Sequence, residues 1–234
     1  MKTTRGYINR TLLVLMPLLF MSVGMANDIY VTQSGDTLDL DITQDGQNNT
    51  VGNSTTSSSS VGATTTLNID QIGNSNVITY AINGATYSGV INLVGNSNNV
   101  DLNCDSTGGN SSCGTANAVI NFTGSSNDID LDIGQTSSAA TADVDLVGQS
   151  GSDSNVIAAT VDGNSAILSI TVNGDTNNWL IDIDGNGDVN GHTLIHTHTG
   201  GIADVDIVQS GINDQYINMT TSGDNHDIDI SQTD

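Results

Sequence analysis

The chain has 234 residues, and its three basic side chains, Lys2, Arg5 and Arg10, all lie within the first ten positions. The rest of the chain carries 26 acidic side chains, all Asp, and contains no Lys, Arg or Glu. Because nucleic acids and anionic membrane surfaces are bound through Lys and Arg, this charge distribution argues strongly against both as partners.

Residues 1–26 are predicted to be a signal peptide. A basic start is followed by an apolar run from Leu12 to Val23 and by the small-residue site Gly24-Met25-Ala26, the pattern that signal peptidase cleaves. We therefore expect a secreted mature protein at 27–234. A membrane-spanning helix needs about 20 apolar residues, and no later segment has that character, so no membrane insertion is expected.

The composition of residues 27–234 predicts an all-β protein. Gly, Asn, Asp, Ser and Thr, which favour turns, are interspersed with Ile, Val and Leu, which favour strands. The two kinds alternate strictly at 38–42 and 129–133, which places aliphatic side chains on one face of a strand and Asp on the other. Aromatic residues are few, so a thin core fits better than a thick β-sandwich.

A short repeat, Gly-x-x-Asn, recurs through this part of the chain. Its five clear copies are Gly46 to Asn49, Gly73 to Asn76, Gly95 to Asn98, Gly124 to Asn127 and Gly174 to Asn177. Several glycines lie eleven residues apart, as Gly73, Gly84 and Gly95 do. Each eleven-residue unit predicts one strand and one tight turn, with Gly supplying a positive φ. Two units form a coil of about 22 residues, and stacked coils form a cross-β-like β-solenoid with two sheets around a narrow core.

Three stretches depart from the repeat and predict loop insertions, near 53–66, 105–117 and 134–142. Cys104 and Cys113, the only two cysteines, lie at the second of them. In an exported chain this pair predicts a disulfide that closes the loop. A single elongated domain is the simplest organisation of residues 27–234.

One segment has the spacing of a calcium-binding loop. Its oxygen-bearing side chains lie at alternate positions, at Asp182, Asp184, Asn186 and Asp188, with Gly187 at the sixth position. The twelfth position is Thr193, where such loops place a bidentate Glu. An ordinary strand and turn is therefore the favoured interpretation, and a weak Ca²⁺ site is the alternative. No other cofactor is indicated.

Three histidines, His192, His196 and His198, are spaced by even numbers of residues. In a strand they would project from one face and could bind a transition metal or form a pH-responsive patch. Plain outward-facing polar residues are the favoured interpretation. No nucleophile or zinc motif accompanies them, and Asp recurs as a feature of the repeat, so we do not expect an enzyme.

Two repeats extend to Gln44-x-Gly46-x-x-Asn49 and Gln71-x-Gly73-x-x-Asn76, and Gln-Ser-Gly recurs at 33–35, 149–151 and 209–211. This pattern resembles the curlin repeat, whose family forms curli, the extracellular amyloid fibres of bacterial biofilms. The resemblance implies a curlin-like β-solenoid that assembles with itself and with other curlin-like subunits. It also implies export through a curli-type outer-membrane secretion apparatus and a role in a cell-surface fimbrium and in cell adhesion.

Gln and Asn at one place in each coil would stack as amide ladders that hold copies together. The expected ladder residues are Gln44, Asn49, Gln71, Asn76, Asn98, Asn127 and Asn177. Stacked Asp would repel one another at about 1 kcal/mol per pair in water, so acid, salt or calcium should promote assembly. The sequence thus predicts a structural subunit or accessory component of extracellular fibres, with a monomeric calcium-binding adhesin as the alternative.

Overall fold

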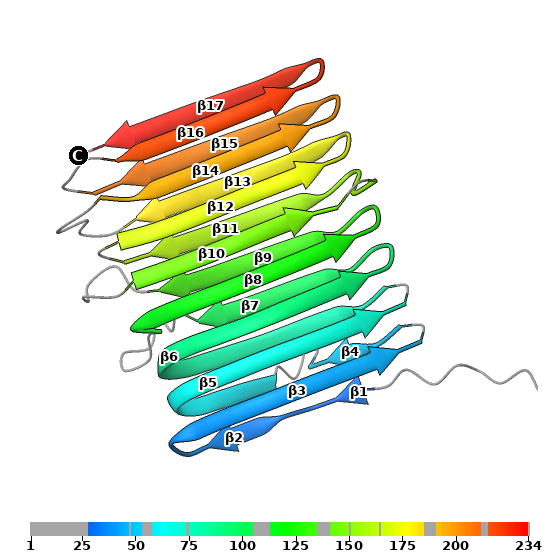
Figure 1. The fold of residues 1–234 in the computed structure, drawn as a ribbon, viewed down its shortest axis with the longest axis vertical. Helices are drawn as coiled ribbons and strands as arrows, with labels where there is room; N and C mark the ends of the chain where they lie inside the picture. The colour runs from blue at the N-terminus through cyan, green and yellow to red at the C-terminus, as the bar shows by residue number, and fades with distance from the viewer. Residues whose placement is uncertain are drawn as a thin grey trace, which may run out of the picture.

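The computed structural model describes residues 28–46, 48–52, 58–73, 75–104, 113–134, 141–149, 151–163, 165–184, 191–211 and 215–233. These residues form 17 strands that pair in parallel and contain no helix, so none of them forms a helix that could cross a membrane. The strands stack into a single β-solenoid (Figure 1), as the repeat predicts. The expected signal peptide at 1–26 lies outside the described residues.

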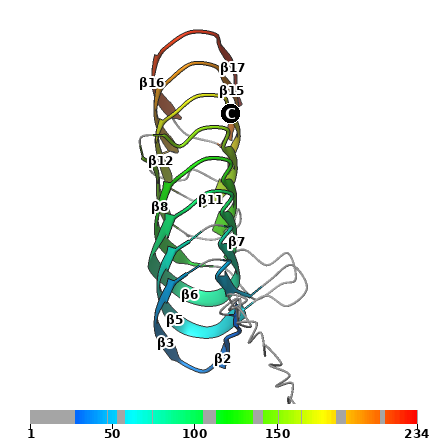
Figure 2. The ribbon, with the colours of Figure 1, turned by 90° about the vertical axis from the view of Figure 1, so that its right-hand side faces the viewer.

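Each coil contributes one strand to each of two faces, which Figure 2 shows edge-on. Face A consists of β3 (Thr37–Asp45), β8 (Thr115–Thr123), β10 (Thr141–Gly148), β12 (Ser165–Asn173), β14 (Thr193–Thr199) and β16 (Tyr216–Ser222). Face B consists of β1 (Asp28–Ile29), β2 (Thr32–Ser34), β4 (Thr50–Val51), β7 (Asn99–Cys104), β9 (Asp128–Gly134), β11 (Val156–Asp162), β13 (Asn177–Asp184), β15 (Ala203–Ser210) and β17 (His226–Thr233). Two long strands, β5 (Ser58–Ile72) and β6 (Val77–Val94), bend from face B round to face A.

The shortest coils have the predicted length. Asn76 and Asn98 occupy the same place in successive coils and are 22 residues apart, as are Asn155 and Asn177. Longer coils separate Asn98 from Asn127 by 29 residues. Extra residues fall within 53–57, 105–112 and 135–140, which are outside the described residues and within the predicted insertions. The coil from Asn177 to Ala203 has 26 residues, and its extra residues lie between β13 and β14, where the sequence analysis did not predict an insertion.

The predicted insertions are too long. Residues 58–66 belong to β5, 115–117 to β8, and 141–142 to β10. The Ser/Thr tract forms strand because residues 58–62 pair with β6 and because two of its hydroxyl groups satisfy each other inside the bend, where Ser60 Oγ lies 3.0 Å from Thr65 Oγ1 and both residues are buried. Low apolar content is therefore a poor guide to where this strand begins.

The in-register stacking turns the core into columns of like side chains. One column on face A runs through Ile42, Ile69, Ile91, Ile120, Leu146, Ile170, His196 and Met219. In the central coils these side chains are at most 1% exposed. Parallel strands lie about 4.8 Å apart, so each aliphatic side chain packs on its equivalent in the coils above and below.

Glycines of the repeat stack at one corner of the solenoid. Gly46, Gly73, Gly95 and Gly124 have φ between +123° and +159°, whereas Gly174 is not among the positive-φ residues. A Cβ on Gly95 would overlap the carbonyl oxygen of Gly73 in the neighbouring coil, and a Cβ on Gly174 would overlap that of Ser152. At Gly95 and Gly174 the corner therefore requires glycine mainly because successive backbones approach so closely there.

We expect Gly95→Ala to lower the free energy of unfolding by about 3 kcal/mol more than Gly46→Ala does. Gly46 has a similar φ, but a Cβ there would meet only Asn49 Oδ1 at 3.6 Å. Chemical denaturation of the two variants separates the backbone clash from the conformational strain that they share. Equal losses would show that close approach of the coils does not explain the glycines.

Candidate functional site

An asparagine ladder runs along the corner next to these glycines. Asn98 Nδ2 donates to Asn127 Oδ1 at 2.9 Å, Asn127 Nδ2 to Asn155 Oδ1 at 2.9 Å, and Asn155 Nδ2 to Asn177 Oδ1 at 3.0 Å. The backbone N–H of Asn76 reaches Asn98 Oδ1 at 3.3 Å. These side chains are buried, so the ladder is an internal feature of the fold.

Each amide in the middle of the ladder has several partners. Asn127 Oδ1 accepts from both Nδ2 and the backbone N–H of Asn98, and Asn127 Nδ2 also donates to Gly124 O at 2.8 Å. A Gly-x-x-Asn turn thus bonds to itself and to the next turn. Because buried polar groups are costly when unpaired, this arrangement explains why Asn recurs at a fixed distance after the corner residue.

The glutamines form separate, shorter pairs. Gln71 Nε2 donates to Gln44 Oε1 at 2.6 Å on face A, and Gln232 Nε2 donates to Gln209 Oε1 at 2.9 Å on face B. Asn49 stands at the start of the asparagine column, where Nδ2 donates to Gln44 O at 3.2 Å. All seven expected ladder residues are buried, and they form two columns, one of asparagine and one of glutamine.

The sequence analysis missed Asn155, which is preceded by Ser152 where the repeat has glycine. Ser154, the residue before this Asn, has a left-handed φ of +55°, close to the +61° of Ser126 in the preceding turn. The left-handed residue and the following Asn are thus kept while the glycine is replaced. A search for the Asn alone at coil spacing would have found this position.

The three histidines face inward, so the prediction of outward polar residues is wrong. His192, His196 and His198 do lie on one face of the chain, as their spacing indicates, but each is fully buried. Leu194 and Ile195 are both aliphatic and point to opposite faces, so alternation alone left the choice of face open.

Two of these histidines pack around Trp179 of β13. The ring centroid of Trp179 lies 4.5 Å from that of His196 and 5.1 Å from that of His198, and His198 lies 5.0 Å from His226. His198 Nε2 donates to Gly174 O at 2.8 Å. In the next coil Ala203 takes the ladder position, so His198 occupies the corner where the asparagine ladder ends.

This cluster favours neutral imidazoles. Burial lowers the pKa of His196 to about 4, with smaller contributions from His198 and His226. Burial also lowers the pKa of His198, opposed by its hydrogen bond to the Gly174 carbonyl and by Asp175. Among the described residues no group of three or more His, Cys, Asp or Glu side chains is arranged to hold a metal ion.

The possible calcium loop is described only at its start. Asp182 and Asp184 lie near the end of β13, whereas Asn186 and Asp188 lie outside the described residues. Cys104 and Cys113 form a disulfide with a Cα–Cα distance of 5.7 Å, and both are buried. This bond joins the ends of the 105–112 segment to the core.

Asp side chains on the outside of the solenoid are mostly separated by neutral residues. On face A, Asn68 Nδ2 donates to Asp41 Oδ1 at 2.8 Å and Asn92 Nδ2 to Asp70 Oδ1 at 2.6 Å. Directly stacked Asp pairs occur on face B, at Asp101 and Asp130, Asp204 and Asp227, and Asp206 and Asp229. Burial raises the pKa of Asp130, and repulsion from the carboxylates of Asp101 and Asp128 raises it further. Repulsion between stacked carboxylates is therefore concentrated on face B.

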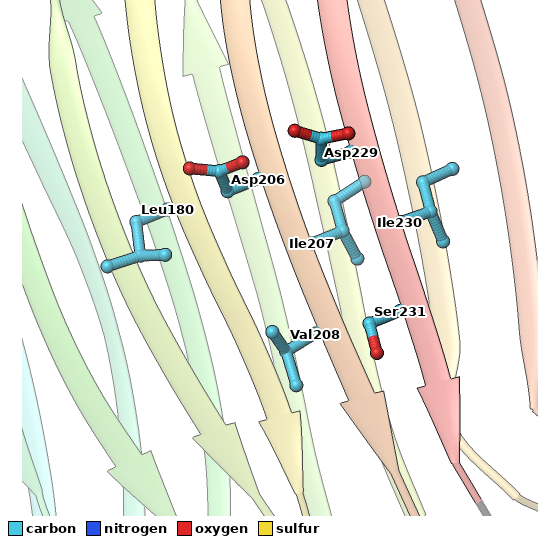
Figure 3. A pocket seen from close by; sticks show the side chains of 7 residues that line it. All are labelled: Leu180, Asp206, Ile207, Val208, Asp229, Ile230 and Ser231. Carbon is cyan, nitrogen blue, oxygen red and sulfur yellow. The ribbon is translucent and has the colours of Figure 1, made fainter.

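The two ends of the described solenoid leave its core partly open. Ile29, Leu38 and Leu40 at one end, and Ile217, Met219 and Ile228 at the other, are only partly buried. Next to the second end, Ile230 is 49% exposed and lines a hollow of about 360 Å³ on the outer surface of face B, together with outward side chains such as Leu180 and Val208. Figure 3 shows this hollow, with Asp206 and Asp229 side by side on β15 and β17.

We expect Asn127→Ala to lower the free energy of unfolding by about 3 kcal/mol, because it leaves donors of Asn98 and the Gly124 carbonyl without buried partners. Asn99→Ala is the matched control, since Asn99 makes one exposed hydrogen bond of 3.4 Å to Asp128. That variant should lose less than about 1 kcal/mol. Chemical denaturation measures both, and equal losses would contradict a structural role for the ladder.

The buried His196 predicts a loss of stability in acid. Its folded pKa, about 4, is below its ordinary value of 6.5. The unfolded chain therefore binds the proton more readily, and stability present above pH 6.5 is lost as the pH falls towards 4, by roughly 3 kcal/mol. His196→Ile, which matches the column of Ile170 and Met219, should remove this part of the loss. Denaturation at pH 7.5 and pH 4.5 measures it.

Thr197→Ile, on the outer face of the same strand, is the control and should keep the full loss. Asp130 and Asp143 have raised pKa values, and they oppose the trend equally in both variants. An unchanged pH dependence in His196→Ile would show that this imidazole does not limit stability in acid.

The chain was also compared with known proteins. No protein-family model, no curated protein and no solved structure matches it. Its proposed role therefore depends on the chemistry of the ladders and of the open ends.

Proposed function

We propose that the protein is a self-assembling structural subunit, or an accessory component, of extracellular curli-like amyloid fibres in a biofilm matrix. The observation that carries this proposal is the pair of open ends, which expose half-covered aliphatic columns and strand edges that no described residue pairs with. Such edges are templates for strand addition. The partner is another copy or another curlin-like subunit, and the fibre contributes to cell-surface adhesion.

End-to-end contact would complete the burial that each end lacks. Fully burying an aliphatic side chain stabilises by about 1.5–3 kcal/mol, so each half-covered residue contributes about 1 kcal/mol. Several such residues and the backbone hydrogen bonds of two new strand pairs act together at one joint. These gains must offset the free-energy cost of association, which is about 4 kcal/mol or more.

The outer surface favours growth along one axis. Residues 27–234 carry only negative charge, so side-by-side association of two solenoids brings like charges together. At the ends, by contrast, aliphatic and amide columns face outward. This asymmetry supports linear fibres over amorphous aggregates. Assembly outside the cell would use the signal peptide expected at 1–26 and a curli-type secretion apparatus, which the resemblance of the repeat to curlins implies.

The test is electron microscopy with thioflavin fluorescence on residues 27–234, compared with Met219→Lys and Ile195→Lys. Both substitutions add one positive charge, but Met219 lies in an inward column at the open end, whereas Ile195 points outward on β14, one coil away from that end. Wild type and Ile195→Lys should form thioflavin-positive fibres. Met219→Lys should delay fibre growth at least tenfold, because a charge at the open end must be buried at the joint.

Incubation with calcium and with a chelator distinguishes the fibre subunit from the other candidate function, a calcium-dependent adhesin. A wild-type protein that remains monomeric in every condition and binds calcium would support the adhesin and contradict the fibre subunit. Equal rates of fibre growth in the two Lys variants would show that the open end does not take part in assembly.

A further inference from the structure

Both ends of the described solenoid lie on face B, which creates a geometric problem for simple end-to-end stacking. The first coil begins with β1 and β2, and the last strand is β17, all three on face B. Placing β1 and β2 of a second copy on β17 would leave one strand position empty between β16 and β3 of that copy on face A. The joint would then contain a gap about 9.6 Å wide, two strand spacings, where 4.8 Å is needed.

The first and last segments of face B carry nearly the same sequence. Residues 28–34 read Asp-Ile-Tyr-Val-Thr-Gln-Ser, and residues 227–233 read Asp-Ile-Asp-Ile-Ser-Gln-Thr. Three positions are identical, three are conservative changes, and only Tyr30 and Asp229 differ in kind. The two segments also have the same place in the coil, because Ile29 and Ile228 belong to one inward column.

These two segments differ in how firmly they are held. β1 and β2 contain two and three residues, and they pair with β4 and β5 through two and three register positions. β17 contains eight residues, all of which pair with β15. The N-terminal segment is thus the weaker occupant of a position that β17 fits in sequence.

We propose that two copies join by strand exchange, in which β17 of one copy displaces β1 and β2 of the next and pairs with its β4 and β5. This inference rests on the proposed function and specifies the contact through which the fibre grows. The exchange moves β3 of the incoming copy directly onto β16, so both faces continue without a gap.

The columns on face A match across this joint. Leu40 of the incoming copy would lie on Ile217, and Ile42 on Met219, in the columns that these residues already share within one solenoid. Outside, Asp41 would lie on Asn218, which repeats the contact of Asn68 with Asp41 at 2.8 Å. Inside the joint, aliphatic side chains therefore pack on aliphatic side chains, and outside it a carboxylate lies next to an amide.

The charges on face B favour exchange over simple addition. Asp227 already stacks on Asp204, and simple addition would place Asp28 of the next copy on top of them as a third carboxylate. In the exchanged joint the neighbour of Asp227 is Thr50, the residue that otherwise pairs with Asp28. Exchange also places the incoming β5 against Ile230, whose exposed side chain lines the hollow in Figure 3.

Cysteine pairs in the full chain distinguish the two joints. Thr43 and Thr220 point outward on β3 and β16 and are exposed. After exchange they would be neighbours about 4.8 Å apart, within reach of a disulfide, whereas simple addition leaves them too far apart. Asp28→Cys with Asp227→Cys reports simple addition. The native cysteines are buried and already joined, so they do not compete.

Fibres of Thr43→Cys/Thr220→Cys are expected to give covalent oligomers on mild oxidation, at least tenfold more than either single variant. Asp28→Cys/Asp227→Cys should stay near the level of its single variants. The reverse result, or strong dimer formation by Thr220→Cys alone, would overturn the exchange. Fibres that cross-link in neither pair would also overturn it while leaving the proposed function in place, and a failure to form fibres at all would overturn both.

Discussion

The in-register stacking of parallel coils is the constraint on which every other feature of this protein depends. Strand spacing of about 4.8 Å places each residue directly on its equivalent in the next coil. A favourable contact such as Ile69 on Ile91 is then repeated along the column, and an unfavourable one is repeated too. Stability therefore requires that every column be compatible with itself, which explains the small set of residue types used.

Four solutions to this requirement occur in the structure. Aliphatic columns fill the core, while asparagine satisfies its own amide by bonding to the next asparagine, as Asn127 does with Asn155. Glycine occupies the corner where backbones touch, as at Gly95. Outside, Asp is largely kept from stacking on Asp by neutral neighbours such as Asn68. The same rules that hold coils together within the chain apply at its ends, which is why a second copy is a compatible partner.

The sequence predicted the features that repeat and missed those that do not. The coil length, the corner glycines and most of the asparagine column could be predicted because each recurs at a fixed spacing. The inward orientation of His196 could not be predicted, since this histidine lies in a column of aliphatic residues and packs against Trp179 from the other face. Nor could the strand at 58–66 be predicted, because its hydroxyl groups pair across the bend between Ser60 and Thr65. Both depend on contacts between residues from different parts of a coil, which periodicity does not report.

The mass per unit length of unstained fibres, measured by scanning transmission electron microscopy, tests the central claim most directly. Face A of one chain contains β3, β5, β6, β8, β10, β12, β14 and β16, and continuous stacking gives one chain per about 38 Å of fibre at a spacing of 4.8 Å. A value near one chain per 38 Å is the predicted result. Two chains in that length, or fewer than one, would contradict a fibre in which the coils of successive copies form a single uninterrupted stack.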